Sequence, residues 1–140
     1  VDFDNDSVGT SLKCCEALGD RLWGVRLDTS NTLVDKSIVP VMQNFKPVGV
    51  TPQLVEMTRK ALDNSGYGHV KIIVSGGFNP DRIAEFEKLQ VPVDAYGVGS
   101  YLMRGVNAFT ADVVLLDGRP CAKVGREYQP NQRLEVVNSR

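Results

Sequence analysis

Two short glycine clusters, each placed after an apolar run, constrain the fold of this chain more than any other feature. Ser75-Gly76-Gly77 follows the run Val70-Lys71-Ile72-Ile73-Val74, and Tyr96-Gly97-Val98-Gly99-Ser100 follows residues 91–95. The segment from Pro80 to Gln90 between them has the pattern of a helix. The sequence therefore predicts a strand, a glycine turn, a helix, a second strand and a second glycine turn.

Glycine turns at the carboxyl ends of parallel strands are suited to binding anions. Because glycine has no Cβ, the backbone comes close to a ligand and its N–H groups donate hydrogen bonds to it. In (β/α) barrels, the loops after two late neighbouring strands frequently bind a phosphate group in this way. The pattern predicts a phosphorylated small molecule as the ligand.

Composition narrows the class of protein further. The chain has 140 residues, of which 42% are hydrophobic and 24% charged, and this is typical of one soluble domain. A net charge of −1 without a basic stripe argues against nucleic acid as a partner. The apolar runs are far shorter than a membrane span. The spacing of Cys14, Cys15 and Cys121 fits no metal site and predicts reduced thiols in the cytoplasm.

The rest of the chain predicts strands that alternate with helices. A helix capped by Asn5, Asp6 or Ser7 ends near residue 18, and Thr51-Pro52 starts another that ends at 64. The irregular pattern of residues 29–50 predicts a long functional loop or lid. The pattern of residues 99–105 predicts a short helical turn. Residues 1–4 have the pattern of the end of a strand, and further predicted strands cover residues 22–27, 70–74 and 93–96. A hairpin pairs 112–116 with 121–124 around Asp117-Gly118.

Alternating strands and helices place the chain in the α/β class with a parallel sheet. Four parallel strands cannot close a barrel that needs about eight. We therefore interpret residues 1–106 as the C-terminal half of a (β/α) barrel. Residues 107–140 would form a hairpin and an extended tail that pack on a second domain outside this chain. The chain begins in a predicted strand without Met, so we expect a piece of a longer protein. An open doubly wound sheet is the alternative.

Polar side chains follow the predicted strands where a ligand would meet the glycine turns. Asp2 and Asp4 follow the first strand, and Arg26 and Asp28 end the second. Parallel strands share one carboxyl edge, so these side chains would share a rim with the glycines. Arginine and amides suit a phosphate, and carboxylates suit hydroxyls or a cation. Each of these residues also has a purely structural explanation. Arg26 could form an ion pair at the rim, and the aspartates could cap turns. His69 would lie at the opposite rim.

The ordered motifs resemble those of nicotinate phosphoribosyltransferases over nearly the whole chain. The resemblance lies in Arg26-Leu27-Asp28-Thr29-Ser30, in residues 74–78 and 96–100, and in residues 113–126 after the barrel. It implies an irregular phosphoribosyltransferase-type barrel that forms nicotinate mononucleotide and pyrophosphate from nicotinate and phosphoribosyl pyrophosphate, with ATP hydrolysis. It also implies Mg²⁺ bound with phosphoribosyl pyrophosphate and ATP, no tightly bound cofactor, no metal ligands among these residues, and a homodimer with sites near its interface.

The same resemblance implies roles for individual residues. Asp2 and Asp28 would be catalytic, and Arg26 would face the ribose, nicotinate and pyrophosphate. The 5-phosphate would lie on the two glycine clusters, at Ser75, Gly76, Gly77, Gly97, Gly99 and Ser100. The phosphorylated histidine of the family has no counterpart here, so we expect the 140 residues alone to be inactive. The alternatives are a quinolinate or nicotinamide phosphoribosyltransferase, or a non-catalytic half-barrel that binds a ribose phosphate.

Overall fold

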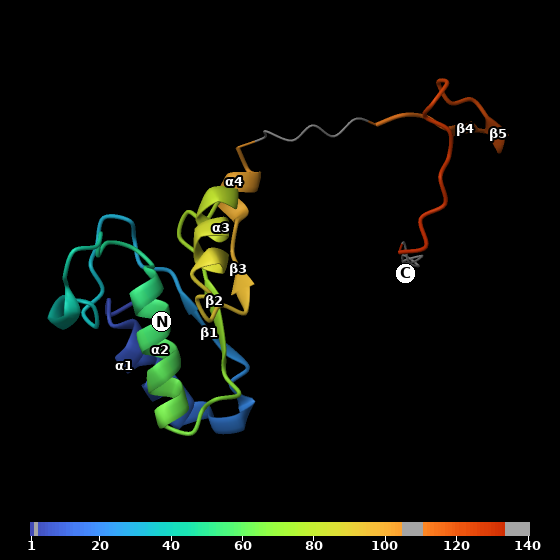
Figure 1. The fold of residues 1–140 in the computed structure, drawn as a ribbon. Coiled ribbons are helices and arrows are strands. Elements are labelled where there is room, and N and C mark those ends of the chain that lie inside the picture. The colour runs from blue at the N-terminus through green and yellow to red at the C-terminus, as the bar shows by residue number, and fades with distance from the viewer. Residues whose placement is uncertain (2, 105–110, 134–140) are drawn as a thin grey trace. The chain divides into compact units, whose positions relative to one another are not determined.

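The computed structural model describes residues 1, 3–104 and 111–133 (Figure 1). The chain divides into two compact units, Val1–Val106 and Asn107–Arg140. The first unit combines helices with a parallel sheet, so the predicted α/β class is confirmed, while closure into a barrel stays a prediction. None of the helices in the described part of the chain is long and apolar enough to cross a membrane.

Three parallel strands form the sheet of the first unit in the order of the sequence. β1 (Gly24–Leu27) pairs with β2 (Lys71–Val74), and β2 pairs with β3 (Ala95–Tyr96). Helix α2 (Pro52–Asn64) connects β1 to β2, and α3 (Pro80–Lys88) connects β2 to β3. Because all three strands run in the same direction, their carboxyl ends lie along one edge of the sheet.

Local sequence signals determine where the helices begin. The Asp6 side chain accepts a hydrogen bond from Gly9 N and caps α1 (Ser7–Leu18), which the 3-10 turn Gly19–Arg21 follows. Thr51 caps α2 and Asn79 caps α3, and each cap precedes a proline at the first helical position. Such caps satisfy N–H groups that have no partner within the helix. The predicted starts of these helices are confirmed.

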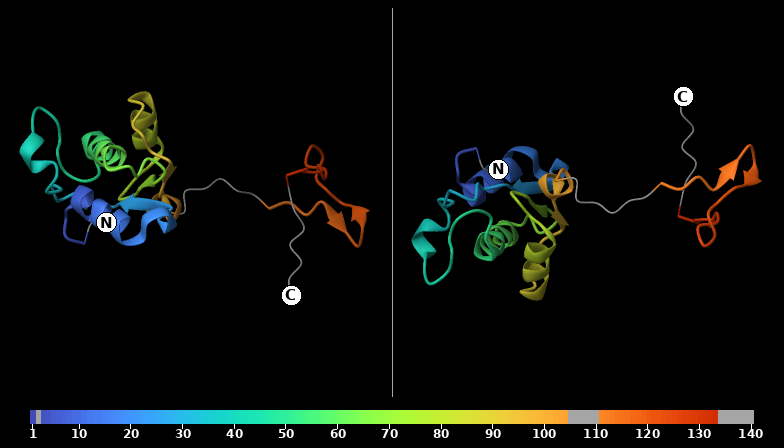
Figure 2. Two further views of the ribbon diagram at one scale, coloured as in Figure 1. Left: turned by 90° about the horizontal axis from the view of Figure 1, so that it is seen from below. Right: turned by 90° about the horizontal axis from the view of Figure 1, so that it is seen from above.

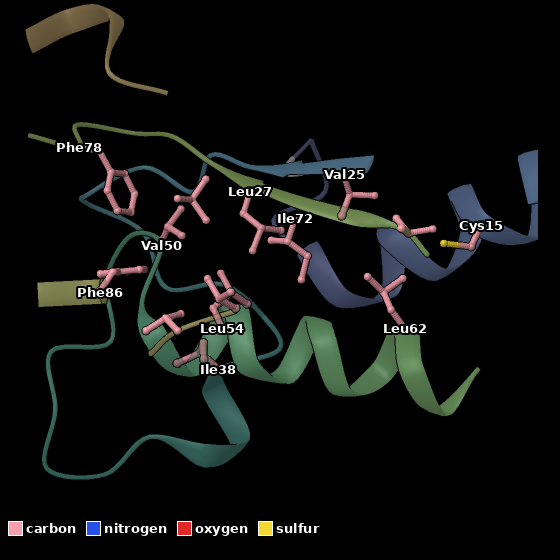
Figure 3. Packing of buried hydrophobic residues seen from close by; sticks show 14 residues of the cluster. Cys15, Val25, Leu27, Ile38, Val50, Leu54, Leu62, Ile72, Phe78 and Phe86 are labelled. Carbon is pink, nitrogen blue, oxygen red and sulfur yellow. The ribbon is translucent and has the colours of Figure 1, made fainter. Parts of the chain in front are cut away.

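The core lies between one face of the sheet and the helices, with α1 and α2 packed side by side (Figure 2). Figure 3 shows Val25, Leu27 and Ile72 between the strands and α2. Burial of each side chain of this size contributes about 1.5–3 kcal/mol. Arg26 alternates with these residues on β1 and is exposed, and Ile73 on β2 is half-buried. In the part of the chain that the structure describes, this parallel sheet is thus covered on one face only.

The long loop after β1 is anchored to the rest of the unit at several points. Ile38 and Val50 are fully buried in the core. The buried carboxylate of Asp35 accepts hydrogen bonds from the Ser7 hydroxyl at 2.6 Å, from Ser7 N at 3.0 Å and from Ser37 N at 2.9 Å. These contacts tie the loop to the start of α1. The short 3-10 turn Val39–Val41 lies between the anchors.

The predicted first strand does not form in the described residues. Phe3 and Asp4 lie in a turn and are exposed, and Asp2 lies outside the described residues. The Val1 amino group donates a hydrogen bond to Arg26 O at 3.0 Å, so the segment meets β1 without building a ladder with it. This prediction was wrong for the described residues, because a strand needs a ladder of backbone hydrogen bonds and Phe3 and Asp4 lie in a turn instead.

The second unit contains a short antiparallel pair, β4 (Leu115–Leu116) and β5 (Arg119–Pro120). Asp117 and Gly118 between them both have positive φ, 49° and 74°, as a tight two-residue turn requires. The second strand therefore begins directly after Gly118, at residue 119 and not at the predicted residue 121. In this unit Cys121 is exposed.

Removal of the Asp35 carboxylate is expected to destabilise the protein. Asp35→Ala leaves the buried hydroxyl and amide of Ser7 without their acceptor, and loss of one hydrogen bond to a charged group costs about 1.5–3 kcal/mol. Unfolding in urea should show at least this decrease. The control Asp20→Ala removes an exposed carboxylate and should change stability by less than about 0.5 kcal/mol. Equal stability of the two variants would contradict the anchoring role.

Two glycines of the turn after β3 are expected to differ in their tolerance of a methyl group. A Cβ at Gly97 would lie 2.9 Å from the Ser75 Cβ, whereas a Cβ at Gly99 would meet nothing within 4 Å. Gly97→Ala should therefore lower the free energy of unfolding by about 1–3 kcal/mol. Gly99→Ala should change it by less than about 0.5 kcal/mol. A thermal melt of both variants tests the difference, and two unchanged melting temperatures would refute the close packing.

Candidate functional site

Three of the predicted site residues form one hydrogen-bonded network at the carboxyl edge of the sheet. Arg26 Nη1 donates to Asp28 Oδ2 at 3.0 Å and to Ser75 Oγ at 3.2 Å. The Ser75 hydroxyl donates to Asp28 Oδ1 at 2.6 Å. Because β1 and β2 are neighbours in register, residues 49 positions apart in sequence meet at one point. The network holds the Asp28 carboxylate in one orientation.

The three side chains of the network differ in how far they are exposed to solvent. The side chain of Arg26 is 60% exposed and that of Asp28 is 31% exposed, while Ser75 is buried. An ion pair this exposed contributes about 0–1 kcal/mol to stability. Only Nη1 of the Arg26 guanidinium donates to other described residues, and its two N–H groups serve Asp28 and Ser75, so three of the five N–H donors can serve a ligand. The pair is better suited to binding than to stabilisation.

The glycine turn after β2 adds two backbone donors beside this network. Gly76 and Gly77 have φ values of +88° and +83°, in the left-handed region that favours glycine. A Cβ at Gly76 would lie 3.3 Å from Asp28 Oδ1, so the turn also approaches the network closely. Neither amide donates a hydrogen bond within the described residues. Two adjacent N–H groups are thus available for an anion.

The turn after β3 supplies fewer free amides than its glycines suggest. Gly97 N donates to Val74 O at 2.7 Å, so this amide belongs to the sheet. Gly99 and Ser100 begin the short helix α4 (Gly99–Leu102), and within the described residues their amides donate to no acceptor. Ser100 is exposed. The structure therefore assigns Gly97 a packing role, which the resemblance of the motif did not reveal.

Sequence reasoning missed Arg82, a residue of α3 that contacts the glycine turn. Its guanidinium donates to Gly76 O at 2.9 Å and to Val50 O at 2.6 Å. Burial lowers the pKa of Arg82, and the guanidinium lies 4.2 Å from the centre of the Phe78 ring. Nothing in the local sequence distinguishes it from an ordinary charged residue of an amphipathic helix. Only the three-dimensional arrangement brings it to this turn.

A cleft of about 410 Å³ lies beside Arg82 and was also not predicted. Its lining includes Asn31, Lys46, Val48, Glu85 and Phe86. The described residues hold no cluster of three or more His, Cys, Asp or Glu side chains that could bind a metal ion.

The other polar candidates stand apart from the network. Asp4 is exposed in the turn near the N-terminus, and no hydrogen bond joins it to the described site residues. His69 precedes β2 at the opposite edge of the sheet, where its ring meets Tyr67 at a centroid distance of 6.5 Å. The Tyr96 hydroxyl donates to Glu87 Oε1 at 2.6 Å. Burial and this hydrogen bond raise the pKa of Tyr96 to about 12.

Known proteins are similar to part of this chain in sequence and in structure. No protein-family model matches the chain. Nicotinate phosphoribosyltransferase pncB2 of Mycobacterium tuberculosis is 34% identical over 65 residues, which are 46% of this chain and 14% of that protein. Nicotinate phosphoribosyltransferase pncB1 of the same organism is 38% identical over 74 residues, which are 50% of this chain and 16% of that protein.

The crystal structure of nicotinate-nucleotide pyrophosphorylase from Pyrococcus furiosus superimposes with a TM-score of 0.53 and 33% sequence identity. The match covers 87% of this chain and 27% of that one. The chain thus spans a small part of the length of the proteins that it matches. Within that part, the chain is similar in sequence to nicotinate phosphoribosyltransferases and similar in fold to a nicotinate-nucleotide pyrophosphorylase.

Proposed function

We propose that the protein carrying this chain forms nicotinate mononucleotide and pyrophosphate from nicotinate and phosphoribosyl pyrophosphate, with ATP hydrolysis, in NAD synthesis. One observation carries the proposal. The Arg26–Asp28–Ser75 network and the free amides of Gly76 and Gly77 lie together at the carboxyl edge of a parallel sheet. The names of the relatives support the same class of reaction.

Phosphoribosyl transfer needs a site that holds the 5-phosphate at a fixed place. In the reaction, the pyridine nitrogen forms a bond to C1 of the ribose, and pyrophosphate leaves with the electron pair of the broken C–O bond. We assign the 5-phosphate to the amides of Gly76 and Gly77, joined by those of Gly99 and Ser100. Free backbone N–H groups at glycine turns bind phosphate without a clash from a Cβ atom.

The charged pair serves the other half of the substrate. Arg26 would bind the pyrophosphate through the free part of its guanidinium, which matches phosphate oxygens in geometry. Asp28 would accept hydrogen bonds from ribose hydroxyls and stabilise positive charge that develops at C1. Ser75 acts by holding Asp28 in place. Asp2 remains a proposed catalytic residue outside the described residues.

Mg²⁺ would enter this site with phosphoribosyl pyrophosphate and with ATP. Proteins commonly bind Mg²⁺ through one or two carboxylates together with substrate phosphates. Although the resemblance implies no metal ligand among these residues, Asp28 fits this role because its carboxylate has lone pairs beyond those used by Arg26 and Ser75. When bound, the ion neutralises part of the charge of the pyrophosphate.

We also propose that the full protein is a homodimer in the cytoplasm. Its partners would be small molecules, and neither nucleic acid nor a membrane.

An assay of the intact protein tests the proposed reaction. The protein is incubated with phosphoribosyl pyrophosphate, Mg²⁺ and ATP, and with nicotinate, quinolinate or nicotinamide in parallel. We expect nicotinate mononucleotide from nicotinate, faster with ATP than without it. Product from quinolinate or nicotinamide alone would instead favour one of those phosphoribosyltransferases. A folded protein that uses none of the three pyridines would contradict the proposal.

Gly77→Val is expected to abolish binding of phosphoribosyl pyrophosphate, because the side chain fills the space in front of the free amides. Gly66→Val is the matched control, since Gly66 also has a φ of +83° and its Cβ would meet nothing within 4 Å. Both variants place valine at the same positive φ, and a Cβ at Gly77 would in addition lie 3.1 Å from Asn31 Nδ2. Titration calorimetry should show loss of affinity only for Gly77→Val. Unchanged affinity in that variant would rule out the phosphate assignment.

Arg26→Ala and Asp28→Ala are expected to lower turnover about ten- to a hundredfold, the effect of losing one charge-assisted hydrogen bond. Arg26→Ala should melt near the unmodified protein because its side chain is exposed, whereas Asp28→Ala also removes the acceptor of the buried Ser75 hydroxyl and should melt slightly earlier. Arg21→Ala removes an exposed arginine elsewhere and should leave turnover unchanged. If the two site variants melt much earlier at normal turnover, the pair is structural.

A further inference from the structure

Arg82 connects the glycine turn to the end of the long loop. From α3, its Nη1 donates to Gly76 O at 2.9 Å and its Nη2 donates to Val50 O at 2.6 Å. The two acceptors lie 26 residues apart in sequence (76 − 50) and belong to different loops. One planar guanidinium therefore fixes both loops relative to each other. A lysine in this place has a single ammonium group on a flexible stem and lacks this fork of donors.

The surroundings of Arg82 keep the guanidinium in one place. Its central carbon lies 4.2 Å from the centre of the Phe78 ring and 5.8 Å from that of the Phe86 ring. A cation over an aromatic face is attracted to it. The start of α3 does not depend on the Arg82 side chain, because the Asn79 side chain caps the helix. The side chain thus acts on the loops and not on the helix that carries it.

The bond to Gly76 O determines the direction of a neighbouring donor. The carbonyl of Gly76 and the N–H of Gly77 belong to one planar, trans peptide unit, so they point in opposite directions. When Arg82 holds the carbonyl on the α3 side, the Gly77 N–H points away from Arg82. A hydrogen bond to the carbonyl also polarises the peptide and makes its N–H a stronger donor.

We propose that Arg82 is a positioning residue that aims the Gly77 N–H at the phosphate of the phosphoribosyl substrate. The inference rests on the proposed function, because it assumes that this turn receives that phosphate. Arg82 does not touch the substrate in this arrangement. Its contribution is the orientation of the peptide between Gly76 and Gly77, which glycine alone would leave free to rotate.

Arg59 provides a matched control within the same unit. Its guanidinium also bridges two backbone carbonyls, Val70 O at 2.7 Å and Tyr67 O at 3.1 Å, and it pairs in addition with Asp63 at 2.7 Å. These carbonyls precede β2 at the opposite edge of the sheet from the glycine turn. Replacement by lysine should therefore disturb a similar fork of hydrogen bonds in Arg59→Lys and in Arg82→Lys, but only the second lies next to the site.

The experiment compares Arg82→Lys and Arg59→Lys in the intact protein. Both variants should melt at a lower temperature than the unmodified protein. Arg82→Lys should bind phosphoribosyl pyrophosphate about tenfold more weakly in calorimetry and raise its KM similarly, with an unchanged KM for nicotinate. Arg59→Lys should bind phosphoribosyl pyrophosphate with unchanged affinity. As a measurement on the unmodified protein, the Gly77 amide should exchange with solvent more slowly when phosphoribosyl pyrophosphate is added.

The outcomes separate failure of the inference from failure of the proposed function. If the unmodified protein binds the substrate and Arg82→Lys binds it equally well, the inference is overturned and the proposed function stands. Equal weakening in both variants overturns the inference as well, because the effect is then one of general stability. If Arg82→Lys does not fold, the unmodified protein gives the answer. The inference is then overturned when phosphoribosyl pyrophosphate leaves the exchange of the Gly77 amide unchanged. An unmodified protein without affinity for the substrate overturns the proposed function and, with it, the inference.

Discussion

The parallel pairing of β1 with β2 is the constraint on which the candidate site depends. Leu27 lies opposite Val74, so the residues that follow the two strands start side by side. The ladder continues one step further, because Ser75 N donates to Leu27 O at 2.9 Å. Asp28 and Ser75 meet at this point, and Arg26 reaches them from the exposed face of β1. A shift of the register by one residue would separate Asp28 from Ser75 and would reverse the faces of β1.

At the carboxyl edge of the sheet, the residues that stabilise the fold differ from those that form the candidate site. The buried face of the strands, with Val25, Leu27 and Ile72 against α2, supplies apolar burial. The exposed pair of Arg26 and Asp28 adds little to that energy. Its arrangement is instead a consequence of the rigid sheet below it. A site that sits on a stable sheet edge can keep free donors in water without weakening the fold.

The sequence was informative where the structure depends on local chemistry. The capped starts of α1, α2 and α3 follow from Asp6, Thr51 and Asn79, each of which satisfies N–H groups of its own helix. The glycine turns were found for a similar reason, because a positive φ at Gly76 and Gly77 restricts the residue type. In these places a few neighbouring residues determine the conformation.

The sequence was uninformative where contacts join distant segments. The fork of Arg82 to Gly76 and Val50 has no local signal, and neither has the buried Asp35 that ties a loop to α1. The predicted strand at residues 1–4 failed because its apolar pattern says nothing about whether a partner continues the ladder. The hydrogen bond of Gly97 N to Val74 O likewise depends on the position of β3 in the sheet.

The exposed face of the sheet is the face that would line the interior of the proposed barrel. Parallel sheets are normally covered on both faces, yet Arg26 is exposed and Ile73 is only half-buried on the face opposite the helices. In a (β/α) barrel this face forms the interior, and side chains from alternate strands fill it in layers. Arg26 lies one residue from the carboxyl end of β1, so in such a barrel it would belong to the layer nearest the active-site rim. The same placement that leaves its guanidinium exposed here would then direct it toward the substrate above the core.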